Sequence, residues 1–138
     1  MFVVDTNVIS ELIRAEPAAP VAAWFARHPM SELALTAVTA GELSYGAARL
    51  PAGQRNRKLA AAVADLLGRF AGRIVPYDLR AAVEYGAVAA ARERMGRPIG
   101  VADAQIAAIC RSTGATLVTR NVRDFADTGV ELVDPWAA

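Results

Sequence analysis

Short apolar segments alternate with helical stretches along this chain of 138 residues. The apolar segments span residues 2–4, 33–35, 73–76, 116–119 and 130–133, and each has the length of a short buried strand. Apolar residues at helical spacing predict helices over 6–14, 21–27, 55–70, 79–95 and 101–112, and another from Thr36 or Thr39 to about Leu50. Strands joined through helices form parallel sheets that are covered on both faces. The order of elements therefore predicts an α/β fold with a short parallel sheet.

The composition is that of one folded globular domain. A domain of 138 residues buries roughly 68–70% of its unfolded surface, so it needs no metal or disulfide to fold. Hydrophobic residues make up 54% of the chain and charged residues 21%, which excludes a mainly disordered protein. The sequence has no internal repeat and no linker. We expect residues 1–138 to form a single domain.

The charge balance and the scarce residue types exclude several classes of protein. Fifteen basic and fourteen acidic residues leave a net charge of +1, so any contact with nucleic acid must be local. Cys110 and His28 are the only cysteine and histidine, which excludes an internal disulfide, a cysteine zinc site and a multi-histidine centre. The first residues do not resemble a signal peptide, and no apolar run reaches the length of about 18 residues needed for a membrane span. We expect a cytoplasmic protein that does not contact the membrane.

Asp5 directly follows the first predicted strand. Open parallel sheets bind ligands outside the carboxyl ends of their strands, so its carboxylate is a candidate for the site. Asp is also a favoured N-cap residue, and Asp5 could instead cap the helix that follows it. A phosphate-binding loop is excluded, because no G-x-x-x-x-G-K-[ST] sequence occurs.

Glu42 lies three residues after Thr39, which is the spacing of a helix capping box. In that case Glu42 would bond only to the backbone of its own helix. It also lies beside the apolar stripe formed by Leu43, Ala47 and Leu50, which favours a position at the edge of the core. The sequence leaves both interpretations open.

Asp103 is the most informative single residue. It lies in the first turn of a predicted helix and shares a face with Ile106, Ala107 and Cys110. An interaction with the helix dipole explains an acid in the first turn, but it does not explain an acid on a buried face. A carboxylate there is costly unless it is paired or bound to metal, so we predict a functional role.

The turn after the fourth predicted strand carries several more polar side chains. Thr119, Asn121 and Asp124 could present oxygen atoms to the same sheet edge, although Asn and Asp also favour turns for local reasons. Arg120 and Arg123 flank this turn and are the better candidates for phosphate contacts. The other basic clusters, at residues 55–58 and 92–97, are more typical of solvated surfaces.

Carboxylates that converge at one sheet edge repel one another. At ~4 Å each pair costs about 4 kcal/mol at an effective dielectric of 20, and a hard divalent cation removes that repulsion. An oxygen-only ligand set suits Mg²⁺ or Mn²⁺, which can activate water and offset the charge of a phosphodiester. A phosphatase of the haloacid dehalogenase type is disfavoured, because Asn7 stands where its second aspartate would be.

Four segments carry a resemblance to a known family. They are residues 4–9 (VDTNVI), 39–43 (TAGEL), 102–107 (ADAQIA) and 119–125 (TRNVRDF). In this order they resemble a PIN domain, and within that family the chain is most similar to VapC-type toxins of bacterial toxin–antitoxin pairs. The ending at residues 133–136 (VDPW) is similar to the FitB-like branch. The resemblance covers essentially the whole chain.

The resemblance implies a three-layer α/β/α sandwich and a Mg²⁺-dependent endoribonuclease that cleaves structured RNA such as tRNA or ribosomal RNA. It implies an acidic core of Asp5, Glu42 and Asp103. The family's fourth acidic position falls at Asn121, so either Asn121 or Asp124 would supply the fourth ligand. We expect the substrate to contact side chains around this core, namely Thr6, Asn7, Thr119, Arg120 and Arg123. Such toxins usually form homodimers and are inhibited by a small antitoxin whose C-terminal segment crosses the active-site groove.

A second hypothesis belongs to a different class. The replacement of an acidic ligand by Asn121 can accompany a loss of activity, which would leave a PIN-like binding module. Such a module would dock an antitoxin and take part in operator DNA binding, and its carboxylates would serve as caps or partner contacts. Uptake of Mn²⁺ distinguishes the two hypotheses, because only the nuclease requires a metal site.

Overall fold

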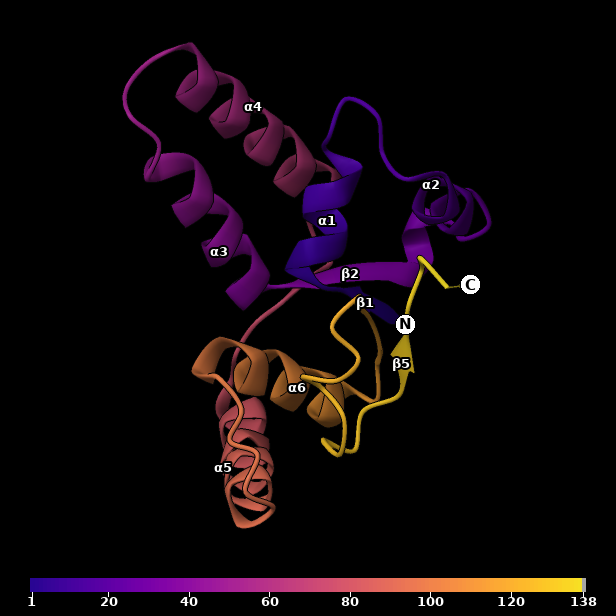
Figure 1. Cartoon of the computed structure of the whole chain (residues 1–138), viewed down its shortest axis with the longest axis vertical. Helices are drawn as coiled ribbons and strands as arrows, with labels where there is room; N and C mark the ends of the chain where they lie inside the picture. The colour runs from indigo at the N-terminus through magenta and orange to yellow at the C-terminus, as the bar shows by residue number, and fades with distance from the viewer. Residues whose placement is uncertain (138) are drawn as a thin grey trace.

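A five-stranded parallel sheet forms the centre of the computed structural model, which describes residues 1–137 (Figure 1). The strands are β1 (Phe2–Val4), β2 (Leu33–Thr36), β3 (Ile74–Val75), β4 (Thr116–Val118) and β5 (Leu132–Val133). Their order across the sheet is β3-β2-β1-β4-β5, and every neighbouring pair is parallel. The predicted parallel sheet is therefore confirmed.

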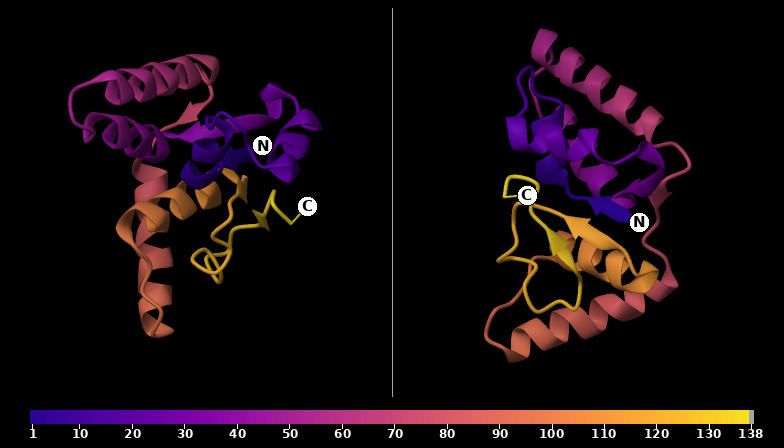
Figure 2. Two further views of the ribbon diagram at one scale, coloured as in Figure 1. Left: turned by 45° about the horizontal axis from the view of Figure 1, so that its top comes forward. Right: turned by 90° about the vertical axis from the view of Figure 1, so that its right-hand side faces the viewer.

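Six α-helices cover the two faces of the sheet. They are α1 (Thr6–Leu12), α2 (Ala19–Ala26), α3 (Ala37–Ala48), α4 (Gln54–Arg69), α5 (Leu79–Arg94) and α6 (Val101–Thr113). Helices α1 to α4 lie on one side of the sheet and α5 and α6 on the other (Figure 1). Helices α3 and α4 form a hairpin, while α5 extends away from the sheet on the opposite side (Figure 2). The molecule is thus the expected three-layer sandwich.

Alternation along the strands divides the interior into two hydrophobic cores. Side chains of β1 point in turn to opposite faces, so Val4 joins the core under α1 to α4 and Val3 joins the core under α5 and α6. The same alternation separates Leu35 from Ala34 in β2, and Val118 from Leu117 in β4. Because these side chains are almost fully buried, a shift of register by one residue would exchange the two cores.

The start of α3 decides between alternatives that the sequence left open. Its N-cap is Thr36, whose Oγ1 accepts a hydrogen bond from the backbone N–H of Thr39 at 3.0 Å. Thr39 is therefore inside the first turn, and the capping-box interpretation of Thr39 and Glu42 does not hold. The Glu42 carboxylate is consequently free to interact outside its own helix.

Other boundaries differ from the prediction by a few residues. Helix α1 ends at Leu12 rather than Arg14, where the turn tightens and the N–H of Arg14 bonds to the carbonyl of Glu11, three residues back, at 3.2 Å. Strand β5 begins at Leu132 rather than Val130, because the chain turns at Gly129 (φ +76°) and Val130 packs against the second core. Within residues 1–137 no helix has the length and apolar composition needed to cross a membrane.

Candidate functional site

The carboxyl ends of three neighbouring strands meet at one edge of the sheet. Asp5 follows β1, Thr36 ends β2 and Thr119 follows β4. The N–H of Asp5 bonds to the carbonyl of Val118 at 2.9 Å, which continues the ladder between β1 and β4 up to this edge. The direction of the strand order reverses between β1 and β4, which is where open α/β sheets bind their ligands.

Asp5 is buried at this reversal, with 4% of its surface exposed. Its Oδ1 accepts a hydrogen bond from the backbone N–H of Thr6 at 2.8 Å and so caps α1. Its Oδ2 accepts bonds from Thr119 Oγ1 at 2.8 Å and from Asn7 Nδ2 at 3.3 Å. The two interpretations of Asp5 therefore coexist, because one oxygen caps the helix while the other faces the sheet edge.

A row of threonine hydroxyls connects Glu42 to this edge. Thr6 Oγ1 donates to Glu42 Oε1 at 2.7 Å and lies 3.1 Å from Thr39 Oγ1. Thr39 Oγ1 in turn lies 3.3 Å from the capping hydroxyl of Thr36. Thr36 and Thr39 are fully buried, whereas Glu42 is exposed, so the row joins the end of β2 to the surface of α3.

Asp103 enters from the opposite layer, in the first turn of α6. The residues on its face, Ile106, Ala107 and Cys110, are buried as expected, while Asp103 itself is half-buried. Burial raises the pKa of Asp103 to about 6, and repulsion from Asp5, Asp124 and Glu42 adds to the shift. The charges of the other three carboxylates therefore act on Asp103.

The turn after β4 presents Asn121, Arg123 and Asp124 on the surface. The N–H of Asn121 bonds to Thr119 Oγ1 at 3.0 Å, and the N–H of Asp124 bonds to the carbonyl of Asn121 at 3.0 Å. Local turn chemistry is therefore present, as one interpretation held. Asp124 also raises the pKa of Asp5 and of Asp103, so its charge acts on the site.

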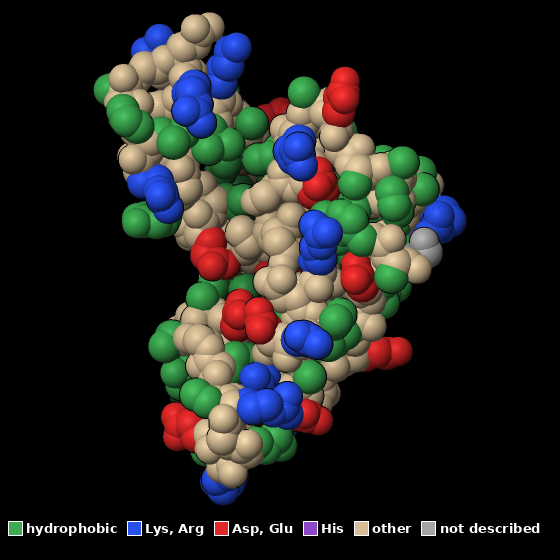
Figure 3. Space-filling view, viewed as in Figure 1, with side chains coloured by type: hydrophobic (Ala, Val, Ile, Leu, Met, Phe, Trp, Pro, Cys, Tyr) green, Lys and Arg blue, Asp and Glu red, His purple; other side chains and the backbone are tan. Residues whose placement is uncertain are grey.

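The pKa of Asp5 is also raised, mainly by burial. Burial is the largest cause that raises the pKa of Asp5, and the charges of Glu42 and Asp124 raise it further. Hydrogen bonds from Thr119 and Thr6 oppose the shift, because they stabilise the ionised form. Acidic side chains also gather at the waist of the molecule, between the two layers of helices (Figure 3).

The donor set at this edge fits a hard divalent cation. It contains only oxygen ligands, and a cation would relieve the repulsion that raises the carboxyl pKa values. Within residues 1–137, no three acidic, histidine or cysteine side chains are already close enough together to enclose an ion. Binding an ion would therefore require the side chains of this edge to move closer together.

Comparison with known proteins identifies the family. The PIN domain family matches residues 2–131. The chain belongs to this family.

Two relatives and a solved structure show which PIN-domain proteins this chain resembles. It is 39% identical to VapC ribonuclease Y4jK of Sinorhizobium fredii, over 99% of this chain and 98% of the relative. It is 32% identical to the tRNA(fMet)-specific endonuclease VapC of Shigella flexneri, over 99% of this chain and 98% of the relative. The crystal structure of FitAcB from Neisseria gonorrhoeae superposes with a TM-score of 0.93 at 34% identity, and each chain is covered completely. The resemblance to VapC- and FitB-type toxins is confirmed.

Arg120 is held in place beside the acidic edge of the PIN domain. Its guanidinium lies 4.7 Å from the centre of the Trp136 ring, and its backbone N–H donates to Asn7 Oδ1 at 3.3 Å. The side chain of Arg120 is otherwise exposed. A cation–π contact of this kind orients an arginine while leaving its donors free.

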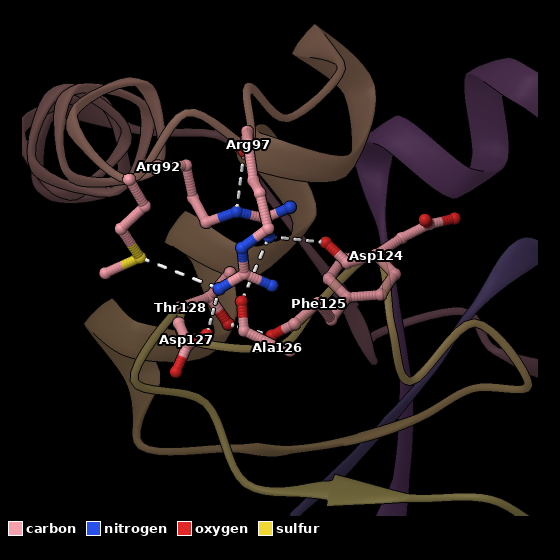
Figure 4. Close-up of polar contacts among 8 residues, drawn as sticks. Arg92, Arg97, Asp124, Phe125, Ala126, Asp127 and Thr128 are labelled. Carbon is pink, nitrogen blue, oxygen red and sulfur yellow. Dashed lines mark hydrogen bonds and ion pairs between the residues drawn. The ribbon is translucent and has the colours of Figure 1, made fainter.

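Arg92 is a residue whose role the sequence did not reveal. The basic cluster at 92–97 was expected to be solvated, but Arg92 is only 5% exposed. Its guanidinium donates to backbone carbonyls, including that of Asp124 at 2.7 Å (Figure 4). The sequence could not indicate that Arg92 is buried, because its partners are backbone carbonyls and every residue has one.

Proposed function

We propose that this PIN-domain protein is the ribonuclease toxin of a toxin–antitoxin pair, and that it cleaves structured RNA, tRNA or ribosomal RNA, in a Mg²⁺-dependent reaction. The observation that carries the proposal is geometric: Asp5 lies at the reversal of the sheet, and the hydroxyl of the adjacent Thr6 donates to Glu42. The charges of Asp5, Asp124 and Glu42 raise the pKa of Asp103, which supports a position of all four carboxylates near one edge. The names of the VapC relatives support an RNA substrate and a cut in the phosphodiester chain.

In this proposal Asp5, Glu42 and Asp103 hold the metal. When bound, Mg²⁺ or Mn²⁺ lowers the pKa of a water molecule and offsets the charge of the phosphodiester. Asp5 is oriented by the backbone N–H of Thr6 and the hydroxyl of Thr119, which donate to its two oxygens and favour its ionised form. Glu42 is oriented by Thr6, while Asp103 reaches the same edge from the opposite layer.

Asp124 is the better candidate for the fourth acidic group. Its charge acts on Asp5 and Asp103, and its backbone is fixed by Arg92. Asn121 could still donate its amide oxygen to the ion, and it belongs to the same turn. Asp124→Ala and Asn121→Ala distinguish the two, since only the variant of the true ligand would weaken binding of Mn²⁺.

The RNA backbone would contact the basic and polar side chains around the acidic edge. Arg120 and Arg123 are exposed there, and the guanidinium of Arg120 packs against the Trp136 ring. Thr6 and Asn7 border the edge as well. Thr119 is fully buried and bonds to Asp5, so its part in this proposal is to orient the carboxylate.

A small antitoxin and a second copy of the chain are the proposed protein partners. An apolar cleft of about 410 Å³ lies between α1, α2 and α4, and it would suit an apolar part of the antitoxin. Large apolar side chains are exposed on α3 and α5, with Tyr45 at 67%, Leu79 at 79% and Val83 at 68%. Such residues would suit the interface of a homodimer.

Expression of the chain without an antitoxin in a bacterial host tests the proposal. The parent should arrest growth and produce new RNA 5′ ends at a few positions in tRNA or ribosomal RNA. Asp5→Asn should restore growth at equal protein level, whereas the control Asp65→Asn, which changes an exposed surface ion pair, should remain toxic. Growth arrest by Asp5→Asn equal to that of the parent would contradict the proposal.

A further inference from the structure

The buried guanidinium of Arg92 connects the segment that leads to Asp103 with the loop that carries Asp124. Arg92, near the end of α5, donates from Nε to the carbonyl of Arg97 at 2.8 Å, and from Nη1 to the carbonyls of Asp124 at 2.7 Å and Ala126 at 3.0 Å (Figure 4). None of the ion pairs formed within residues 1–137 includes Arg92. Its buried charge is therefore compensated by backbone carbonyls, and its contacts fix the main chain.

The first of these segments leads into α6. Residues 95–100 turn the chain from α5 to α6, and the N–H of Arg97 also donates to the carbonyl of Arg92 at 3.0 Å. Gly100 is the N-cap of α6, and Asp103 lies in the first turn after it. Fixing the backbone at Arg97 therefore fixes the position from which Asp103 enters the site.

The second segment is the loop of residues 121–128. Arg92 holds its backbone at Asp124 itself, next to Phe125, which is fully buried. The Asp124 carboxylate stays exposed, so the main chain rather than the side chain is anchored. An ion pair between Arg97 and Asp127 joins the same two segments again at the surface.

We propose that Arg92 is a positioning residue that sets the separation of the Asp103 and Asp124 carboxylates and thereby the affinity of the acidic edge for a divalent cation. The inference rests on the proposed function. Carboxylates that repel one another stay close together only if the backbone that carries them is fixed. The planar guanidinium of Arg92 donates to carbonyls of both segments at once and so fixes both. A lysine at this position would place one compact charge on a flexible stem and could not hold both segments.

Isothermal titration of Mn²⁺ into the purified full-length chain tests this role. Arg92→Lys should weaken Mn²⁺ binding about tenfold, because groups that orient metal ligands typically contribute 10–100-fold to affinity. Arg97→Gln, which removes only the surface ion pair with Asp127, should weaken Mn²⁺ binding about twofold to threefold. Arg111→Lys is the matched control, since Arg111 donates to Thr128 at the far end of the same loop but does not contact the 95–100 segment. The control should bind Mn²⁺ with the affinity of the parent.

An Arg92→Lys protein that melts cooperatively and binds Mn²⁺ like the parent would overturn the inference. If Arg92→Lys does not fold, Arg97→Gln tests the same connection between the two segments. An unchanged Mn²⁺ affinity of that variant would overturn the inference as well. The Mg²⁺ concentration for half-maximal RNA cleavage should rise in parallel, with little change in KM for RNA. Failure of the parent to cleave RNA would count against the proposed function, whereas the Mn²⁺ titration still reports on Arg92.

Discussion

Asp5 caps a helix and belongs to the proposed metal site. One oxygen of its carboxylate caps α1 and the other accepts the Thr119 hydroxyl, so a substitution acts on stability and on chemistry through different atoms. The sequence alone left these two roles as alternatives. Because both are satisfied at once, variants can separate them.

Asp5→Asn and Asp5→Ala should both abolish metal-dependent cleavage, but only Asp5→Ala should clearly destabilise the fold. Asn caps helices as well as Asp does, whereas loss of the cap in the Ala variant costs about 1 kcal/mol. We expect Tm of Asp5→Ala to be lower than that of Asp5→Asn by about 3 °C, measured by calorimetry. Equal Tm values would show that the cap contributes little.

Asp103 should lower the stability of the metal-free protein near neutral pH. Its pKa is about 6 in the folded chain against 3.8 for the ordinary group, so the folded state binds the proton more readily. Stability therefore falls as pH rises from about 4 through 6, and the carboxylate is unfavourable above that range. Asp103→Asn should stabilise the fold at pH 7.5 by about 1 kcal/mol, a figure reduced for solvent screening of a half-buried group.

Thermal melts at two pH values check this expectation. The gain in Tm of Asp103→Asn over the parent should be present at pH 7.5 and much smaller at pH 4, where Asp103 is protonated in the folded parent. Asp65→Asn, at an exposed site, serves as the control and should show no such gain. A loss of stability in Asp103→Asn at both pH values would mean that the carboxylate is favourably paired in the fold.

At the scale of the elements, the hydrophobic pattern was enough to predict the parallel sheet and the strand ends that carry Asp5 and Thr119. The start of α3 was not decided, because Thr36 and Thr39 are both good caps in sequence. Tertiary packing resolves this, since Thr36 ends β2 and points its hydroxyl at the first turn. Arg92 was misjudged because its partners are carbonyls, and carbonyls exist at every residue.

The cap at Thr36 should account for a measurable part of the stability. Thr36→Ala removes a buried hydroxyl that accepts from the Thr39 N–H and should lower the free energy of unfolding by about 1 kcal/mol. Thr36→Ser retains the acceptor and should stay closer to the parent. Urea unfolding of the three proteins measures the difference, and equal losses for Ala and Ser would indicate packing of the methyl group instead.

At the scale of the whole molecule, a net charge of +1 does not exclude local groups of like charge. Acidic groups gather at the waist between the helical layers, and the basic side chains lie around them (Figure 3). RNA is polyanionic, so this edge would repel it unless a cation is bound. The sequence predicted acids at one sheet edge, and the structure adds that Glu42 lies on a helix of one layer and Asp103 on a helix of the other.

Cleavage of total cellular RNA by the purified chain, free of antitoxin, is the decisive test of a metal-dependent ribonuclease. We expect discrete fragments in the presence of Mg²⁺, intact RNA with a chelator, and intact RNA with folded Asp103→Asn in Mg²⁺. Fragments that persist with the chelator, or that Asp103→Asn produces as fast as the parent, would contradict a metal site built on these carboxylates. Intact RNA with a folded parent that takes up no Mn²⁺ would also contradict it, and would favour the binding module.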